Sequence, residues 1–135
     1  MNRLFVPYDV AIKLKDKGFD EPCLGYYDPE GLRVQPDYYN RENKNSLFPK
    51  PEITNSPRVS APIYTQVFDW FRKKHKLGHW IDNYYGKRYY CKVVEMKHPH
   101  RHKKFPDTNK TFVFDEYKSY QEAEEALVRR MVEWI

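Results

Sequence analysis

The chain contains one run in which tyrosines are interleaved with basic residues. The candidate ligand-binding residues in this run are Tyr84, Tyr85, Lys87, Arg88, Tyr89, Tyr90 and Lys92. Aromatic rings stack on nucleobases, and lysine and arginine meet phosphate, so this composition is typical of a surface that binds nucleotides or single-stranded nucleic acid. Tyrosines also favour β-strands without any ligand, and the same run would suit a half-polar sheet.

A second candidate is the segment from Lys97 to Lys104, in which His98, His100 and His102 alternate with other residues, most of them basic. Imidazole nitrogen binds zinc and nickel. However, no cysteine is nearby, and the surrounding cations would repel a divalent metal. An exposed basic loop, a contact to an anion or nucleic acid, and a metal site all stay open, and we predict no metal site and no cofactor.

Enzymatic chemistry has no supporting motif. Cys23 and Cys91 stand in strand-like patterns, where free cysteine behaves as a small buried hydrophobe. The acidic pairs Asp20-Glu21 and Asp115-Glu116 are better explained as solvated turns, because adjacent carboxylates on an extended chain point to opposite faces. The glycines are scattered singly and make no phosphate loop or nucleophile elbow. We therefore predict a protein that is not an enzyme.

The composition sets the frame for these residues. With 135 residues, the chain suits one domain and one core, in which 17% aromatic residues would carry much of the burial. Twenty-four Lys and Arg against 19 Asp and Glu leave a net charge of +5, which favours anionic partners. Two cysteines and the absence of a signal peptide or a long apolar span indicate a cytoplasmic protein without membrane contact.

The helices and strands that the sequence pattern predicts make up an α+β fold in one domain, with a small antiparallel sheet packed by helices. Predicted helices cover 7–17, 61–75 and 119–135, predicted hairpins 23–34 and 79–97, a further strand 111–115, and loops 35–57 and 98–110.

The ends of these elements are predicted from local signals. Gly18 should end the first helix, with Phe19 making the apolar contact of a Schellman ending. Ser60 is the expected N-cap of the second helix, and Gly78 its expected end. We also predict a two-residue loop at Gly86-Lys87 between the strands of the second hairpin, and a capping box of Ser119 and Glu122 at the start of the last helix. On the first helix, the residues expected to share one face are Tyr8, Ala11, Ile12 and Lys15.

Three stretches carry a resemblance to other proteins. They are Pro7-Tyr8 through Gly18-Phe19-Asp20-Glu21-Pro22-Cys23, Ala61-Pro62-Ile63-Tyr64 through Asp69-Trp70-Phe71-Arg72-Lys73-Lys74-His75, and Tyr120-Gln121-Glu122-Ala123 onward. Together they resemble small uncharacterised proteins of Bacteroides and their phages or prophages. The resemblance implies a setting rather than an activity, and no site residue follows from it. Small phage accessory proteins often act as inhibitors or sponges against host defence, which favours a binding function by analogy.

Two main hypotheses follow. The first is a non-enzymatic protein that binds a nucleotide-type anion, either a signalling nucleotide or nucleic acid, through the seven candidate residues. The alternative is a module that binds a host or phage protein, and an enzyme of unrecognised type comes third. A homodimer is a reasonable default for so small a protein, although no residue specifies its interface.

Overall fold

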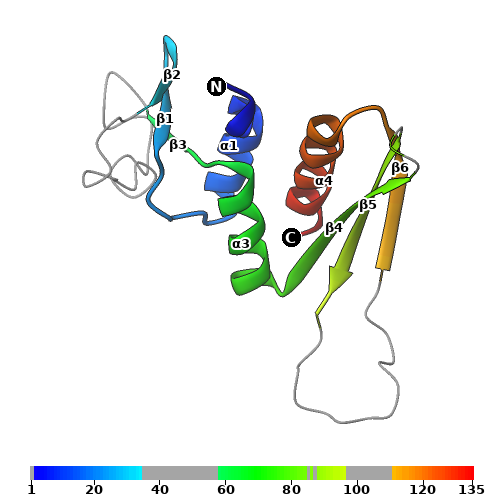
Figure 1. Ribbon diagram of the computed structural model, residues 1–135. Helices are drawn as coiled ribbons and strands as arrows, with labels where there is room; N and C mark the ends of the chain where they lie inside the picture. Colours follow the sequence, from blue (N-terminus) through cyan, green and yellow to red (C-terminus); the bar gives the residue numbers. More distant parts are fainter. Residues whose placement is uncertain (1, 35–57, 85, 87, 97–110) are drawn as a thin grey trace. The chain divides into compact units, whose positions relative to one another are not determined.

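The computed structural model describes residues 2–34, 58–84, 86, 88–96 and 111–135 (Figure 1). These residues form three α-helices and two three-stranded antiparallel sheets, the α+β arrangement that the sequence predicts. The chain divides into two compact units, Met1–Gln66 and Val67–Ile135, and the boundary falls inside helix α3 (Tyr64–His75). That the whole chain is one domain stays a prediction. The loops expected at 35–57 and 98–110 lie outside the described residues.

The first unit contains a short 3-10 helix η1 (Asn2–Leu4), helix α1 (Tyr8–Asp16) and a sheet with strand order β2-β1-β3. Strands β1 (Gly25–Asp28) and β2 (Gly31–Val34) are the predicted first hairpin, with Asp28 opposite Gly31. The carboxylate of Asp28 accepts hydrogen bonds from the backbone N–H groups of Glu30 and Gly31, at 2.9 and 3.0 Å. This local bonding explains why an Asp-Pro-Glu-Gly stretch turns the chain here.

The end of α1 is the predicted Schellman ending. The N–H of Phe19 donates to the carbonyl of Leu14, the N–H of Gly18 donates to that of Lys15, and Gly18 has φ +89°. Leu14 and Phe19 are both buried, as the motif's apolar contact requires. The predicted face of α1 was wrong, because Val10, Ala11 and Leu14 are buried whereas Tyr8 is 53% exposed.

The start of the second predicted helix was also wrong. Residues Val59–Ala61 form strand β3, which pairs with β1 and is buried throughout, and α3 begins only at Tyr64. Pro62 explains the shift, because the residue before a proline disfavours helical backbone. The carbonyl of Pro62 accepts a hydrogen bond from Val6 instead, so this segment ties the N-terminal residues to the first unit.

The second unit contains the C-terminal part of α3, a sheet with strand order β4-β5-β6 and helix α4 (Tyr120–Trp134). Its strands are β4 (Leu77–Tyr84), β5 (Arg88–Glu95) and β6 (Thr111–Tyr117). The sequence predicts one sheet, but the structure has two. The first hairpin pairs with β3, and the second hairpin pairs with β6. Among residues 67–135, the buried apolar side chains include Phe71, Val93, Leu127 and Met131.

Two predicted loop features of this unit differ from the structure. Helix α3 ends at His75, the next residue, Lys76, has φ +55°, and Gly78 lies inside β4. Tyr84 stands opposite Arg88, so three residues rather than two connect β4 to β5, with Gly86 at φ +69°. No helix among the described residues is long and apolar enough to cross a membrane.

Candidate functional site

The two faces of sheet β4-β5-β6 have different environments. Cys91 and Val93 of β5 are fully buried, and the thiol of Cys91 donates to the carbonyl of Ala123 in α4, so this face packs against the helix. Successive strand residues point to opposite faces. The other face, which we call the outer face, therefore carries Trp80 and Asp82 of β4 together with Tyr90 and Lys92 of β5.

The register arranges the outer face in steps along the strands. Gly78 is opposite Val94, Trp80 opposite Lys92, Asp82 opposite Tyr90, and Tyr84 opposite Arg88. Residues two apart in a strand are separated by about 7 Å. The outer face thus alternates aromatic and charged positions along its length.

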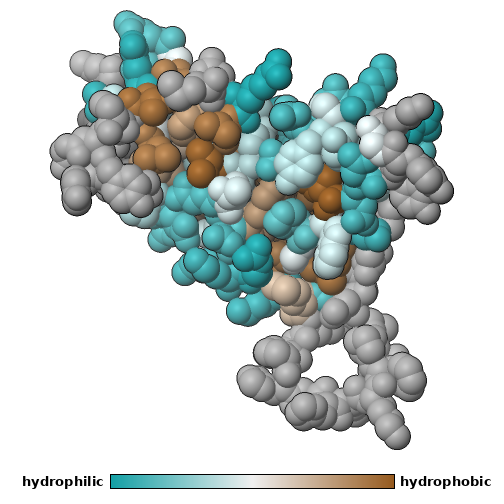
Figure 2. Space-filling model, viewed as in Figure 1, coloured by the Kyte–Doolittle hydropathy of each residue, from teal (hydrophilic) through white to brown (hydrophobic). Residues whose placement is uncertain are grey.

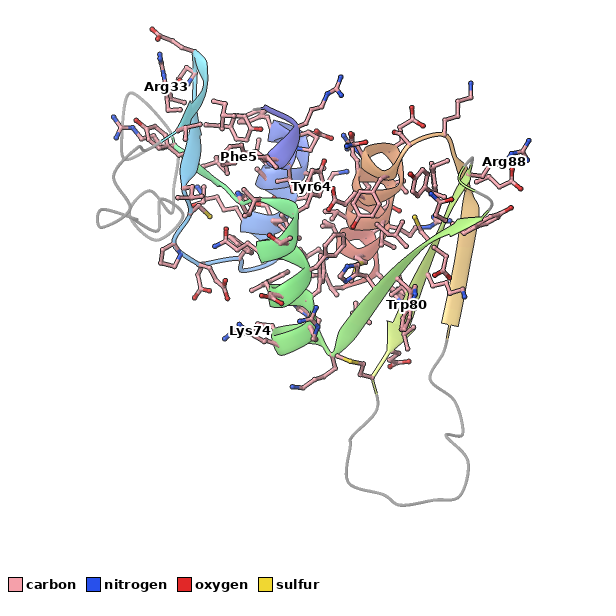
Figure 3. All side chains as sticks on the ribbon, viewed as in Figure 1. Phe5, Arg33, Tyr64, Lys74, Trp80 and Arg88 are labelled. Carbon is pink, nitrogen blue, oxygen red and sulfur yellow. The ribbon has the colours of Figure 1, made fainter. Side chains whose placement is uncertain are left out.

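Trp80 is the most conspicuous residue of this face. Its side chain is 60% exposed, and Figure 3 shows it on the side of the sheet away from α4. Large aromatic side chains usually dominate the burial of a small protein, and an exposed one is characteristic of binding surfaces. Trp80 was not among the predicted site residues, because it precedes the run of tyrosines and basic residues that begins at Tyr84. The alternation in Leu77–Tyr84 held the signal, since it sets Trp80 on the face opposite to Ile81 and the buried Leu77.

The structure brings together only some of the predicted residues. Arg88, Tyr90 and Lys92 share the outer face. Tyr89 lies on the helix side, where its ring meets that of Tyr120 with centroids 6.0 Å apart and planes at 83°. Tyr84 is described by its backbone in β4 alone, and Tyr85 and Lys87 lie outside the described residues.

The cations of the outer face have carboxylate partners on neighbouring strands. Arg88 forms an ion pair with Glu116 of β6, and the hydroxyl of Tyr90 donates to the same carboxylate at 2.7 Å. Lys92 pairs with Asp82 at 3.2 Å. The hydrogen bond from Tyr90, followed by the effect of Arg88, lowers the pKa of Glu116.

A β-bulge places Glu116 within reach of both partners. The β5–β6 register shifts between Tyr89 and Cys91, so that two residues of β6 stand against one of β5. The interpretation of Asp115-Glu116 as a solvated turn is therefore wrong, since both residues belong to β6.

Catalytic candidates are held in unreactive environments. Burial raises the pKa of the Cys91 thiol to about 11, which leaves little thiolate at neutral pH. Cys23 is also buried. The ring of His79 stacks on Phe68, with centroids 3.7 Å apart, and burial, followed by Arg72, lowers the pKa of His79.

Within the described residues, no three or more His, Cys, Asp or Glu side chains gather as a metal site would require. The three alternating histidines His98, His100 and His102 fall outside that part of the chain. Comparison with known proteins adds no further assignment: no family model, no curated protein and no solved structure matches the chain.

Proposed function

We propose that this chain is a non-enzymatic binding protein whose ligand is a nucleotide-type anion held on the outer face. The observation that carries the proposal is the exposed indole of Trp80, which stands opposite Lys92 and one step from Tyr90. A base can stack on such a ring while its phosphate meets the neighbouring cation. Each stacked base contributes about 1–3 kcal/mol, so Trp80 and Tyr90 together suffice for micromolar binding with help from charge.

The ion pairs of the outer face are compatible with this use. The side chain of Arg88 is 64% exposed and that of Lys92 is 39% exposed. Exposed ion pairs contribute only about 0.2–1 kcal/mol, so a phosphate can replace a carboxylate at little cost. Arg88 and Lys92 would then bind phosphate, with Glu116 and Asp82 turning to solvent.

The polarity of the surface also supports a polar ligand. Figure 2 shows hydrophobic residues among hydrophilic and intermediate ones on one face of the molecule, and the outer face itself carries the ion pairs of Arg88 and Lys92 beside Trp80. Obligate protein interfaces are more apolar than this outer face. A nucleotide needs only an isolated ring and nearby cations.

The decisive experiment measures binding of fluorescein-labelled nucleotides and single-stranded DNA and RNA by fluorescence anisotropy. Trp80→Ala should weaken binding by about fivefold or more, which matches about 1 kcal/mol, the lower end of one stacking contact. Trp134→Ala is the matched control, because Trp134 is 39% exposed but belongs to α4. Equal affinity of the two variants would remove the outer face as the binding site.

The second candidate function is a module that binds a host or phage protein. It is favoured by the charge balance of the outer face, where Arg88 and Lys92 are matched by Glu116 and Asp82. Tryptophan, tyrosine and arginine, which Trp80, Tyr90 and Arg88 supply here, are enriched among the residues that contribute most to protein interfaces. Salt separates the two functions, because nucleic-acid binding falls steeply with ionic strength whereas an aromatic protein interface is less sensitive.

The biological setting is proposed together with the function. If the chain does come from Bacteroides or one of its phages, as the three quoted stretches predict, we propose by analogy a cytoplasmic inhibitor or sponge of a phage or mobile element that sequesters a nucleotide-type ligand of host defence. A thermal-shift screen against linear and cyclic nucleotides tests this role, since a ligand at 100 times its Kd adds about 2.7 kcal/mol of stability.

A further inference from the structure

The end of α3 carries basic side chains that the outer face does not use. Lys73, Lys74 and Lys76 are all exposed, and within the described residues none of them has a carboxylate partner. Arg72, in contrast, pairs with Asp69 at 2.7 Å. We call Lys73, Lys74 and Lys76 the basic end of α3, and Figure 3 shows Lys74 pointing away from the helix.

Stabilisation of the helix accounts for only part of this charge. Cations near a helix C-terminus interact favourably with its dipole, and the ammonium of Lys76 donates to the carbonyl of Lys73 at 3.3 Å. That contact occupies one of the three lysines. Glu95, which stands opposite Leu77, supplies one carboxylate in the adjoining strand, so the region keeps an excess of positive charge.

The backbone connects the basic end of α3 directly to the outer face. The N–H of Met96 donates to the carbonyl of Lys76 at 2.8 Å, which extends the pairing of β4 with β5 by one step. With about 3.4 Å per residue, Lys76 is about 14 Å along the strand from Trp80, and Trp80 is as far again from the level of Arg88. Gly78 lies between Lys76 and Trp80, and the flexible side chain of Met96 lies over this step, with its Sδ 3.6 Å from where a Cβ of Gly78 would be.

We propose that the ligand is a single-stranded nucleic acid that continues from the outer face onto the basic end of α3. This inference rests on the proposed function and narrows it. A mononucleotide that stacks on Trp80 can reach Lys92 but not Lys76, which is about 14 Å away along the strand. A strand of about four or more nucleotides places bases on Trp80 and Tyr90 and further phosphates at Lys73 and Lys74.

The test compares labelled single strands of increasing length with a labelled mononucleotide, in fluorescence anisotropy titrations at several salt concentrations. The variant is Lys73→Gln combined with Lys74→Gln. The control is Lys13→Gln combined with Lys118→Gln, which makes the same change of net charge at two exposed lysines elsewhere. Lys76 stays unchanged because its ammonium already donates to the carbonyl of Lys73.

We expect affinity to rise with length up to about four nucleotides or more, and the Lys73/Lys74 variant to lose several-fold affinity for the longer strands only. Its plot of log K against log salt should become shallower by about 1.4, since each phosphate contact to a single strand contributes about 0.7. If affinity is independent of length and the variant matches its control, while Trp80→Ala still abolishes binding, this inference fails and the proposed function stands. If no nucleotide or strand binds, both fail.

Discussion

The hydroxyl of Tyr90 donates a hydrogen bond to the carboxylate of Glu116, 2.7 Å away in the next strand. The same carboxylate pairs with Arg88, so one acidic residue holds two of the residues that we assign to ligand binding. Glu116 therefore competes with any anion for Arg88, and removing its charge should favour the ligand.

Glu116→Gln should accordingly raise the affinity for single-stranded DNA by about two- to fivefold, the range of an exposed ion pair. Glu125→Gln is the control, because it makes the same charge change in α4, where Glu125 pairs with Arg129. Anisotropy titrations of the two variants at one salt concentration measure the difference. A weaker affinity of Glu116→Gln than of the control would contradict a role for Arg88 as a phosphate ligand.

The buried thiol of Cys91 makes stability depend on alkaline pH. Its pKa is raised from 9.0 to about 11 by burial, so between these values the unfolded chain loses the proton while the folded protein keeps it. Stability from this group is complete below pH 9 and is lost as pH rises through 11. Urea unfolding across this range should show a steeper decline for the unmodified protein than for Cys91→Ala. Parallel declines would show that the thiol is not protected.

The same burial predicts slow chemical modification. In the folded protein at neutral pH, both Cys23 and Cys91 should react with a thiol reagent much more slowly than in urea, because reactive cysteines need an exposed and electropositive setting. The rate of colour release from a disulfide reagent, with and without denaturant, measures the protection. Rapid reaction of one equivalent in native buffer would place a cysteine at the surface.

The N-cap of α4 should contribute measurably to stability. The Ser119 hydroxyl oxygen accepts a hydrogen bond from the N–H of Glu122 at 3.2 Å, while the Glu122 carboxylate accepts one from the N–H of Lys118. Ser119→Ala should lower the free energy of unfolding by about 1 kcal/mol, and Ser119→Asp, which caps equally well, should not. Urea denaturation curves compare the two. Equal losses would mean that position 119 acts through something other than the cap.

The positive φ of Lys76 predicts opposite effects for two substitutions. Glycine adopts this backbone conformation without strain, whereas a left-handed β-branched residue costs about 1–2 kcal/mol or more. Lys76→Gly should therefore keep or slightly increase stability, and Lys76→Val should reduce it. Thermal melts of both variants test the end of α3, and the reverse order would show that this end is not left-handed.

Local signals predicted much of the fold. Gly18 and Phe19 ended α1 as expected because a Schellman ending depends on residues within one turn. The hydroxyl of Ser119 capped α4 for the same reason, although the Glu122 carboxylate accepts its hydrogen bond from the N–H of Lys118 rather than from that of Ser119. Such features need no knowledge of distant chain segments.

Features that depend on strand pairing could not be predicted in this way. Strand β3 is only Val59–Ala61, and its burial comes from pairing with β1, more than thirty residues earlier in the sequence. The partners of Arg88 and Tyr90 depend on a register shift that brings Glu116 across from them. Trp80 could have been found, because alternation along β4 already separated it from the buried Leu77.

The bulge in β6 has a consequence for the behaviour of the protein in solution. Among the strands that the structure describes, β6 lies at the edge of the sheet β4-β5-β6, and a regular edge offers its free backbone groups to another chain. The bulge twists this edge and breaks its spacing, which makes it a poor template for the addition of a further strand. The irregularity that brings Glu116 to Arg88 should therefore also protect concentrated protein from fibril growth at this edge.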